Sequence, residues 1–180
     1  MNREVDRWQV FVACVAGILV ASCEMVELVF YEHLPSKAFL KERDVDHPGL
    51  REFIRDGVLF VVGSKAIEQR QKYNIGLAVY SRGAGKTLTV ERVVLAGSAG
   101  DIDNRLDVLV RVDRSAEGEG IYTNSGASIR LFPLIDAADL AHLAGGGDLK
   151  LTVFCRIDGR EASIDFVLTR RVERQIVFPT

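Results

Sequence analysis

The stretch LKLTVFCRIDGREASIDFVL, residues 149–168, decides the fold class of this chain. Apolar side chains alternate with others on both sides of the pair Asp158-Gly159, which is the pattern of two half-buried β-strands. An Asp-Gly pair between such runs favours a type I′ turn, whose twist matches that of the flanking strands. The segment therefore predicts a long antiparallel hairpin. Its alternating apolar side chains are Leu149, Leu151, Val153, Cys155 and Ile157 before the turn, and Ala162, Ile164, Phe166 and Leu168 after it.

Further strand patterns precede and follow this hairpin. The apolar run 58–62 lies between two glycines and suits a strand that is covered on both faces. Residues 75–80 and 88–90 alternate on either side of a glycine-rich turn and predict a second hairpin. Residues 106–112 place apolar and polar side chains on opposite faces of one strand. The remaining strands are expected at 26–33, 129–134 and 172–178.

Two segments predict short helices. In residues 46–57 a capping-type residue and Pro48 mark the start, and Gly57 is placed to end the helix. In residues 136–144 Asp136 precedes a run of helical composition and Gly145 follows it. About seven or eight strands with one or two short helices are typical of an antiparallel two-sheet β-sandwich of immunoglobulin-like architecture. A small closed β-barrel is the alternative.

Length and charge limit the number of domains and the classes of partner. The chain has 180 residues, 23 of them basic and 25 acidic. This length is near the usual size of one domain, and nearly balanced charge provides no field that would attract nucleic acid. We therefore expect one β-sandwich domain over residues 23–180, no nucleic-acid partner and no cofactor.

The N-terminal segment is the least domain-like part of the sequence. Residues 10–22 carry no charge, and Glu24 and Glu27 end this apolar run well short of the roughly 20 residues that a membrane-spanning helix needs. Its length instead suits the apolar region of a secretory signal peptide, which ends in small residues such as Ala21 and Ser22. Residues 1–22 are therefore expected to be a cleaved signal or a short membrane anchor.

The end of this run, Val20-Ala21-Ser22-Cys23, resembles the lipobox of bacterial lipoproteins. The resemblance covers only the first 23 residues and implies cleavage between Ser22 and Cys23. It further implies that the thiolate of Cys23 receives the lipid and becomes the mature N-terminus. Acyl chains on that residue would hold the domain to a membrane, with the domain facing the periplasm or the cell exterior. A secreted or cytoplasmic protein remains the alternative.

Three loop sequences that suggest ligand binding have simpler explanations. The string 82–87, Arg-Gly-Ala-Gly-Lys-Thr, lacks a glycine at Tyr80, where a phosphate loop requires one, and it leads into a strand rather than a helix. We expect a hairpin turn with solvated cations. The acidic segment 101–107 lacks the spacing and the glycine of a calcium-binding EF-hand loop, and residues 117–120 form a similar acidic loop. No metal site is predicted from either.

Histidine and cysteine residues also give no catalytic constellation. His33, His47 and His142 fall in separate segments without metal-ligand spacing, and a helix-capping role is expected for His47 with its acidic neighbours Asp44 and Asp46. Cys155 shares its strand phase with buried residues and is expected in the core. No Gly-x-Ser-x-Gly turn for a serine nucleophile is present. No catalytic residue is predicted.

Three functional hypotheses remain open. The first is a non-catalytic, envelope-anchored module that contacts another envelope component through its loops or a strand edge. The second is an enzyme or metal-dependent binder whose site is assembled from distant loops, for example around Asp44, His47 and Asp101. The third is a soluble protein in which the N-terminal apolar segment is part of the fold. Candidate surface contacts for the first hypothesis are Arg82, Lys86, Arg170 and Arg171.

Overall fold

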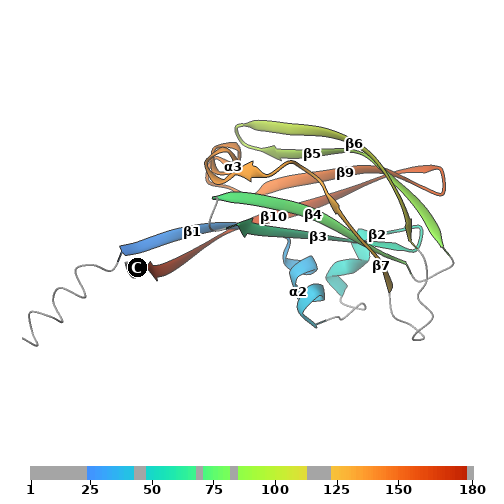
Figure 1. Cartoon of the computed structure of the whole chain (residues 1–180), viewed down its shortest axis with the longest axis horizontal. Coiled ribbons are helices and arrows are strands. Elements are labelled where there is room, and N and C mark those ends of the chain that lie inside the picture. The colour runs from blue at the N-terminus through green and yellow to red at the C-terminus, as the bar shows by residue number, and fades with distance from the viewer. Residues whose placement is uncertain (1–23, 43–47, 68–70, 82–84, 113–122, 178–180) are drawn as a thin grey trace, which may run out of the picture. The chain divides into compact units, whose positions relative to one another are not determined.

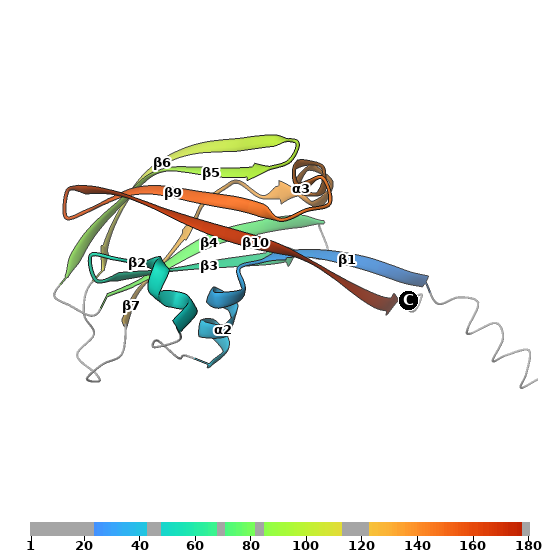
Figure 2. The same ribbon diagram turned by 180° about the vertical axis from the view of Figure 1, so that it is seen from behind.

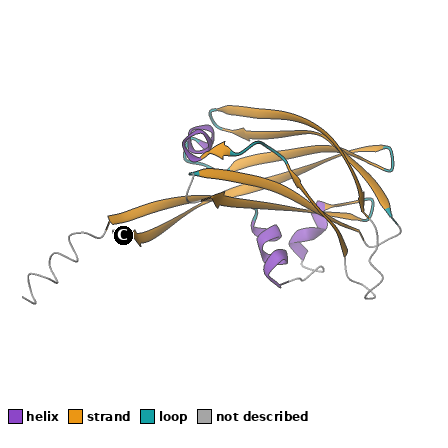
Figure 3. Cartoon of the chain, viewed as in Figure 1, coloured by secondary structure: helices purple, strands orange, loops and turns teal. Residues whose placement is uncertain are grey.

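The computed structural model describes residues 24–42, 48–67, 71–81, 85–112 and 123–177. Strands dominate them (Figure 3). The strands are β1 (Glu24–Glu32), β2 (Ile54–Arg55), β3 (Val58–Ile67), β4 (Lys72–Ser81), β5 (Lys86–Gly97), β6 (Gly100–Val112), β7 (Thr123–Arg130), β8 (Ile135–Asp136), β9 (Leu149–Ile157) and β10 (Arg160–Val177). The helices are α2 (Leu34–Glu42), the 3₁₀ helix η1 (Pro48–Phe53) and α3 (Ala137–Ala144).

The strands form two antiparallel sheets, as expected for a β-sandwich (Figure 1). The first sheet has the order β1-β10-β9-β5-β6, and the second has the order β2-β3-β4-β7, with β8 paired to β4. Residues Phe30–Arg171 make up one compact unit, to which the sites below belong. Residues 24–29 of β1 and 172–177 of β10 belong to a second unit, in which Arg174 binds Glu27 at 3.0 Å.

The hairpin predicted from residues 149–168 is confirmed. β9 and β10 pair from Ile157↔Arg160 to Leu149↔Leu168. Asp158 and Gly159 have φ angles of 49° and 82°, the positive values that a type I′ turn requires at both central positions. The alternating apolar side chains are buried apart from Ala162, which is partly buried. β10 continues beyond the hairpin to Val177 and lies between β1 and β9, so it is an interior strand.

The second predicted hairpin is wrong. β4 pairs with β3 and β7 in the second sheet, whereas β5 pairs with β6 and β9 in the first. Leu77 of β4 and Leu88 of β5 are both fully buried. Alternation therefore identified the buried face of each strand correctly, but a buried face can be directed into the core from either sheet. β4 ends at Ser81 in the second sheet, and β5 begins at Lys86 in the first.

The helices differ in part from the prediction. α3 is confirmed, and Gly145 ends it in the left-handed conformation with its N–H donating to the carbonyls of Ala141 and His142. The predicted helix 46–57 is shorter: η1 ends at Phe53, and Ile54–Arg55 form β2. Gly57 is part of a turn with Asp56, at φ angles of 77° and 48°, that joins β2 to β3. α2 was not predicted.

Helix α2 and the end of β1 lie against the side of β3 that β4 does not occupy (Figure 2). Beyond its short pairing with β2, that side of β3 is bound by side chains. The amide of Val62 donates to Ser36 Oγ at 3.0 Å, and Ser64 Oγ donates to the carbonyl of Tyr31. An unpaired strand edge exposes backbone hydrogen-bonding groups that can template aggregation, and the bond from Val62 to Ser36 satisfies one of them.

Candidate functional site

Lys86, one of the predicted surface contacts, is bound within the fold. Its ammonium group lies 2.7 Å from Asp158 Oδ2, and Asp158 Oδ1 accepts the amide of Thr87 at 3.0 Å. These hydrogen bonds hold the pKa of Asp158 below its usual value. Lys86 thereby ties the start of β5 to the β9–β10 turn. A hollow of about 430 Å³ opens beside it, lined by Asp56, Lys86, Ile157, Asp158 and Arg160. Arg82 lies outside the described residues.

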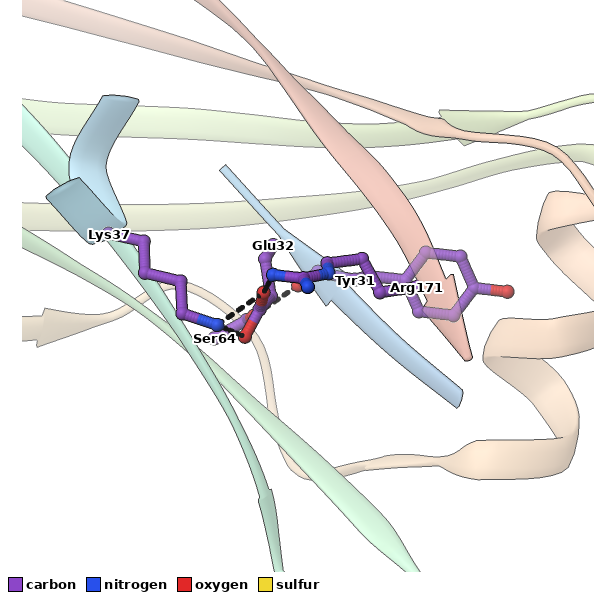
Figure 4. A network of polar contacts seen from close by, with 5 residues as sticks. All are labelled: Tyr31, Glu32, Lys37, Ser64 and Arg171. Carbon is purple, nitrogen blue, oxygen red and sulfur yellow. Dashed lines mark hydrogen bonds and ion pairs between the residues drawn. The ribbon is translucent and has the colours of Figure 1, made fainter. Parts of the chain in front are cut away.

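Arg170 and Arg171 are also engaged. Arg171 Nη1 lies 3.3 Å from Glu32 Oε2, and the same carboxylate accepts Lys37 Nζ at 2.6 and 2.7 Å. Figure 4 shows the Glu32 carboxylate between these two cations. The network joins β1, α2 and β10. The backbone amide of Arg170 donates to Asp148 Oδ1 at 2.9 Å. Arg171 therefore takes part in an ion-pair network, and the backbone of Arg170 is linked to Asp148.

Tyr31, the neighbour of Glu32, carries an unusual buried hydroxyl group. The residue is 1% exposed, its ring contacts Tyr73 edge-on at 6.2 Å, and its hydroxyl has no hydrogen-bond partner among the described residues. Burial raises the pKa of Tyr31, and the positive charge of Arg170 partly opposes that shift. The hydroxyl thus remains neutral, because burial outweighs the influence of Arg170.

We expect Tyr31→Phe to leave stability unchanged or to raise it by up to about 1 kcal/mol. Removing a buried polar group that has no partner costs no hydrogen bond and relieves its desolvation. Urea denaturation followed by circular dichroism would measure this change. A loss of more than about 1 kcal/mol would show that the hydroxyl makes a stabilising bond, with Arg170 as the candidate partner.

His33 is a buried polar residue with contacts to several elements. It is 4% exposed and lies at the start of α2, where its carbonyl accepts the amide of Lys37 at 3.0 Å. Its Nδ1 atom lies 2.6 Å from Ser36 Oγ and accepts the amide of Ser36 at 3.3 Å. The ring contacts Phe53 and Phe166 edge-on, at centroid distances of 4.5 and 5.1 Å. Burial lowers the pKa of His33 to about 4.

Cys155 lies in the core, as predicted. It is 2% exposed, and burial together with the charge of Glu91 raises its pKa to about 11. A thiol must be deprotonated and accessible to act as a nucleophile, and Cys155 is neither at neutral pH. His33 is equally inaccessible. The exposed histidine of the described chain, His142, lies on α3.

Two side chains of the acidic segment of β6, Asp103 and Asn104, are bound within the fold. Asp103 forms a two-pronged pair with Arg92, which holds the pKa of Asp103 below its usual value. Asn104 Nδ2 donates to the carbonyl of Leu131 at 2.7 Å. Within the described residues, no group of three or more His, Cys, Asp or Glu side chains is placed to hold a metal ion. Asp44, Asp46, His47 and the acidic loop 117–120 lie outside the described residues.

A groove on the outer face of the second sheet was not predicted. Its volume is about 270 Å³, and its base includes the cross-strand pair Gly63↔Gly76. A side chain at Gly63 would meet open space. The lining residues are Leu40, Val61, Gly63, Ser64, Lys65, Asn74, Gly76, Ala78 and Ser128. The alternating pattern of β3 and β4 in the sequence places both glycines on the outward face of the sheet. Recognising that they lie opposite each other requires the register of the two strands.

Polar groups along this groove are not fully paired. Asn74 Oδ1 is buried and has no hydrogen-bond partner among the described residues. Lys65 faces Asn74 across the strands and is exposed, with no ion pair in the described part of the chain. Leu40 of α2, 41% exposed, contributes an apolar side chain. The groove therefore combines an apolar surface with one available cation.

The outer face of the first sheet is different because its charges pair with one another. Lys150 binds Asp165 at 2.8 Å, and Arg156 binds Glu91 at 2.7 Å. The guanidinium of Arg92 lies 5.4 Å from the ring centroid of Phe154, in addition to its pair with Asp103. Such exposed pairs add little stability, but they leave few unpaired charges for a partner. This face also exposes Leu109 and Val167, at 70% and 55%, so it combines paired charges with apolar side chains.

Comparison of the chain with protein-family models, with curated proteins and with solved structures found no match. Among the described helices, none has the length and apolar character needed to cross a membrane.

Proposed function

We propose that this chain is a lipid-anchored protein of the bacterial cell envelope, and that its β-sandwich is a non-catalytic module that binds another envelope component. The anchor in this proposal is a lipid on Cys23. The binding surface is the groove on the outer face of the second sheet. An apolar partner segment that carries a carboxylate suits this surface, because Lys65 supplies the opposite charge.

The observation that carries the proposal is the position of the fold relative to Cys23. Residues Phe30–Arg171 form one compact unit, and its buried apolar side chains run from Tyr31 to Leu168. Cleavage before Cys23 would therefore leave this whole unit in the mature chain.

A binding role is supported by the burial and the neutral protonation state of the thiol and of the histidine in the core. The described thiol and the histidine that lies in the core, Cys155 and His33, are both buried in neutral form. The two outer sheet faces also differ: one has mutually paired charges, and the other has a groove whose lysine, Lys65, has no ion pair among the described residues. Recognition is the role that a rigid sandwich with such a surface can perform.

Cell fractionation of a bacterium that expresses the full chain tests the anchor. We expect the wild-type protein in the membrane fraction and Cys23→Ala outside it. Cys14→Ala is the matched control, because the proposed processing removes Cys14 with the signal. Membrane association of all three proteins would instead favour an uncleaved apolar anchor, and a soluble wild-type protein would contradict the proposal.

A photo-crosslinking amino acid at Gly63 tests the binding surface in the same cells. We expect a discrete adduct that Lys65→Glu removes. The same amino acid at Ser163, which is exposed on β10, should give no such adduct. An adduct that is unaffected by the charge of residue 65, or that also forms at position 163, would argue against a specific site in the groove.

A further inference from the structure

His33 lies where five elements of the Phe30–Arg171 unit meet. It follows β1 directly and caps α2, and its ring contacts Phe53 of η1 and Phe166 of β10. Through Ser36 it is connected to Val62 of β3. One buried side chain therefore links α2 and η1 to strands of both sheets.

The hydrogen bonds define the protonation state of this ring. Ser36 Oγ accepts the amide of Val62, so the hydroxyl proton of Ser36 is free to be donated to His33 Nδ1. The amide of Ser36 is also directed at Nδ1, at 3.3 Å. With two donors facing it, Nδ1 acts as an acceptor, and the ring is neutral with its proton on Nε2. A proton on Nδ1 would oppose the amide of Ser36.

We propose that His33 is an acid-sensitive latch whose protonation releases α2 from β3 and uncovers the outer face of the second sheet. The latch goes beyond the proposed function, because it concerns the stability of one helix and requires neither a lipid nor a partner.

The consequence of opening follows from the contacts of α2. Phe39 contacts the ring of Tyr80 edge-on at 5.1 Å, and Tyr80 is 5% exposed. Leu40 lines the groove described above. Release of α2 would expose Tyr80, remove Leu40 from the groove and free the amide of Val62. Acid would thus enlarge an apolar surface that is partly covered at neutral pH.

Charged groups on the surrounding elements do not account for the state of His33. Burial alone lowers its pKa. Glu32 is held by Lys37 and Arg171, and Asp165 by Lys150 and Thr152. The remaining charged side chains described on β1, η1, β3 and β10 are exposed: Glu27 on β1, Arg51 and Glu52 on η1, Lys65 on β3, and Arg160, Glu161, Arg170, Glu173 and Arg174 on β10. Tyr31 is neutral over the relevant pH range, because its pKa is raised from 10.0.

The size of the pH effect follows from the coupling between protonation of His33 and opening of α2. The ring binds a proton with a pKa of about 4 when α2 is closed, and with an ordinary value of 6.5 when it is exposed to water. Protons therefore favour the open form, and the opening equilibrium should rise about 60-fold between pH 7 and pH 4.5. The change should be small above pH 6.5, where the ring is mostly neutral in both forms.

Amide hydrogen exchange of the full chain, corrected for intrinsic rates, tests the latch residue by residue. We expect protection of Val62 and of α2 to fall about 60-fold from pH 7 to pH 4.5. At pH 4.5 the protection of the Val62 amide should be at least about tenfold lower than that of the Val153 amide in the core of β9. Such a difference would show that α2 opens locally while the rest of the domain stays folded. Equal protection of Val62 and Val153 at both pH values would overturn the proposal.

Three variants separate the latch from general acid sensitivity. His33→Asn retains a side-chain acceptor that suits a helix start but does not titrate, so the fall in Val62 protection should disappear. His142→Asn, which removes an exposed histidine, should behave as wild type. Ser36→Ala removes the link to Val62 and should reduce its protection already at pH 7. The latch would be contradicted if Val62 protection in His33→Asn fell between pH 7 and pH 4.5 as much as in the wild type. It would also be contradicted if Val62 protection at pH 7 were unchanged in Ser36→Ala.

Discussion

Gly97→Ala is expected to destabilise the protein by about 3 kcal/mol. Gly97 is the last residue of β5, and a methyl group there would overlap the backbone carbonyl of Leu143, whose carbon would be 2.7 Å away. The neighbouring backbone cannot move easily. The carbonyl of Leu143 accepts the amide of Ala99, and the carbonyl of Ala144 accepts Ser98 Oγ. The substitution must therefore displace the end of α3 from the β5–β6 turn.

Gly63→Ala is the matched control for this prediction. Gly63 also lies in a strand, but nothing is within 4 Å of a methyl group placed there. Replacing a strand glycine with a residue that fits restricts the unfolded chain, so we expect unchanged or slightly higher stability. Urea denaturation of both variants would measure the difference. Similar free energies of unfolding for Gly97→Ala and Gly63→Ala would contradict the close packing of α3 on the turn.

Lowering the pH from 6.5 to 4 is expected to cost the native state about 3 kcal/mol through His33. The pKa of His33 is about 4 in the folded protein and close to 6.5 when the chain is unfolded. The unfolded state therefore binds a proton first as the pH falls. The native stability linked to His33 is fully present above pH 6.5 and decreases until about pH 4, below which both states are protonated.

Denaturant unfolding at several pH values would measure this loss, with His33→Asn and His142→Asn as the comparison. We expect the pH dependence between 6.5 and 5 to be much weaker in His33→Asn and unchanged in His142→Asn. Carboxylates affect the free energy of unfolding at lower pH. The pKa values of Asp103, Asp158 and Asp165 are held below 3.8 by bound cations and hydrogen bonds, so their stabilisation is lost only as the pH falls below about 4. An equally steep dependence in His33→Asn would contradict the assignment.

Short-range patterns predicted the elements that depend on neighbouring residues. The β9–β10 hairpin needs only an Asp-Gly turn between two alternating runs, and the two faces of β6 follow from alternation alone. A second Asp-Gly hairpin, at Asp56-Gly57, was read as the end of a helix. Two residues of β2 are too few to show an alternating pattern, so the turn signal was outweighed by Pro48 and the apolar side chains that follow it.

Long-range pairing was not accessible from the sequence. β4 and β5 are neighbours along the chain, yet each finds its partners in a different sheet, and a local pattern cannot distinguish the two arrangements. The candidate sites show the same limit. Lys86 and Arg171, which were predicted as surface contacts, pair with Asp158 and Glu32, and these partners are 72 and 139 residues away along the chain. His33 caps a helix that was not predicted, and Val62, 26 residues beyond Ser36, completes its network.

The most direct test of the proposed envelope anchor is the intact mass of the protein recovered from a bacterial membrane fraction, measured beside Cys23→Ala. We expect a species that begins at Cys23 and carries a lipid, and we expect this species to be absent from the variant. An unmodified species that begins at Met1 and is found in the soluble fraction would contradict the proposed anchor. In that case the apolar segment 10–22 would have to serve the fold rather than export.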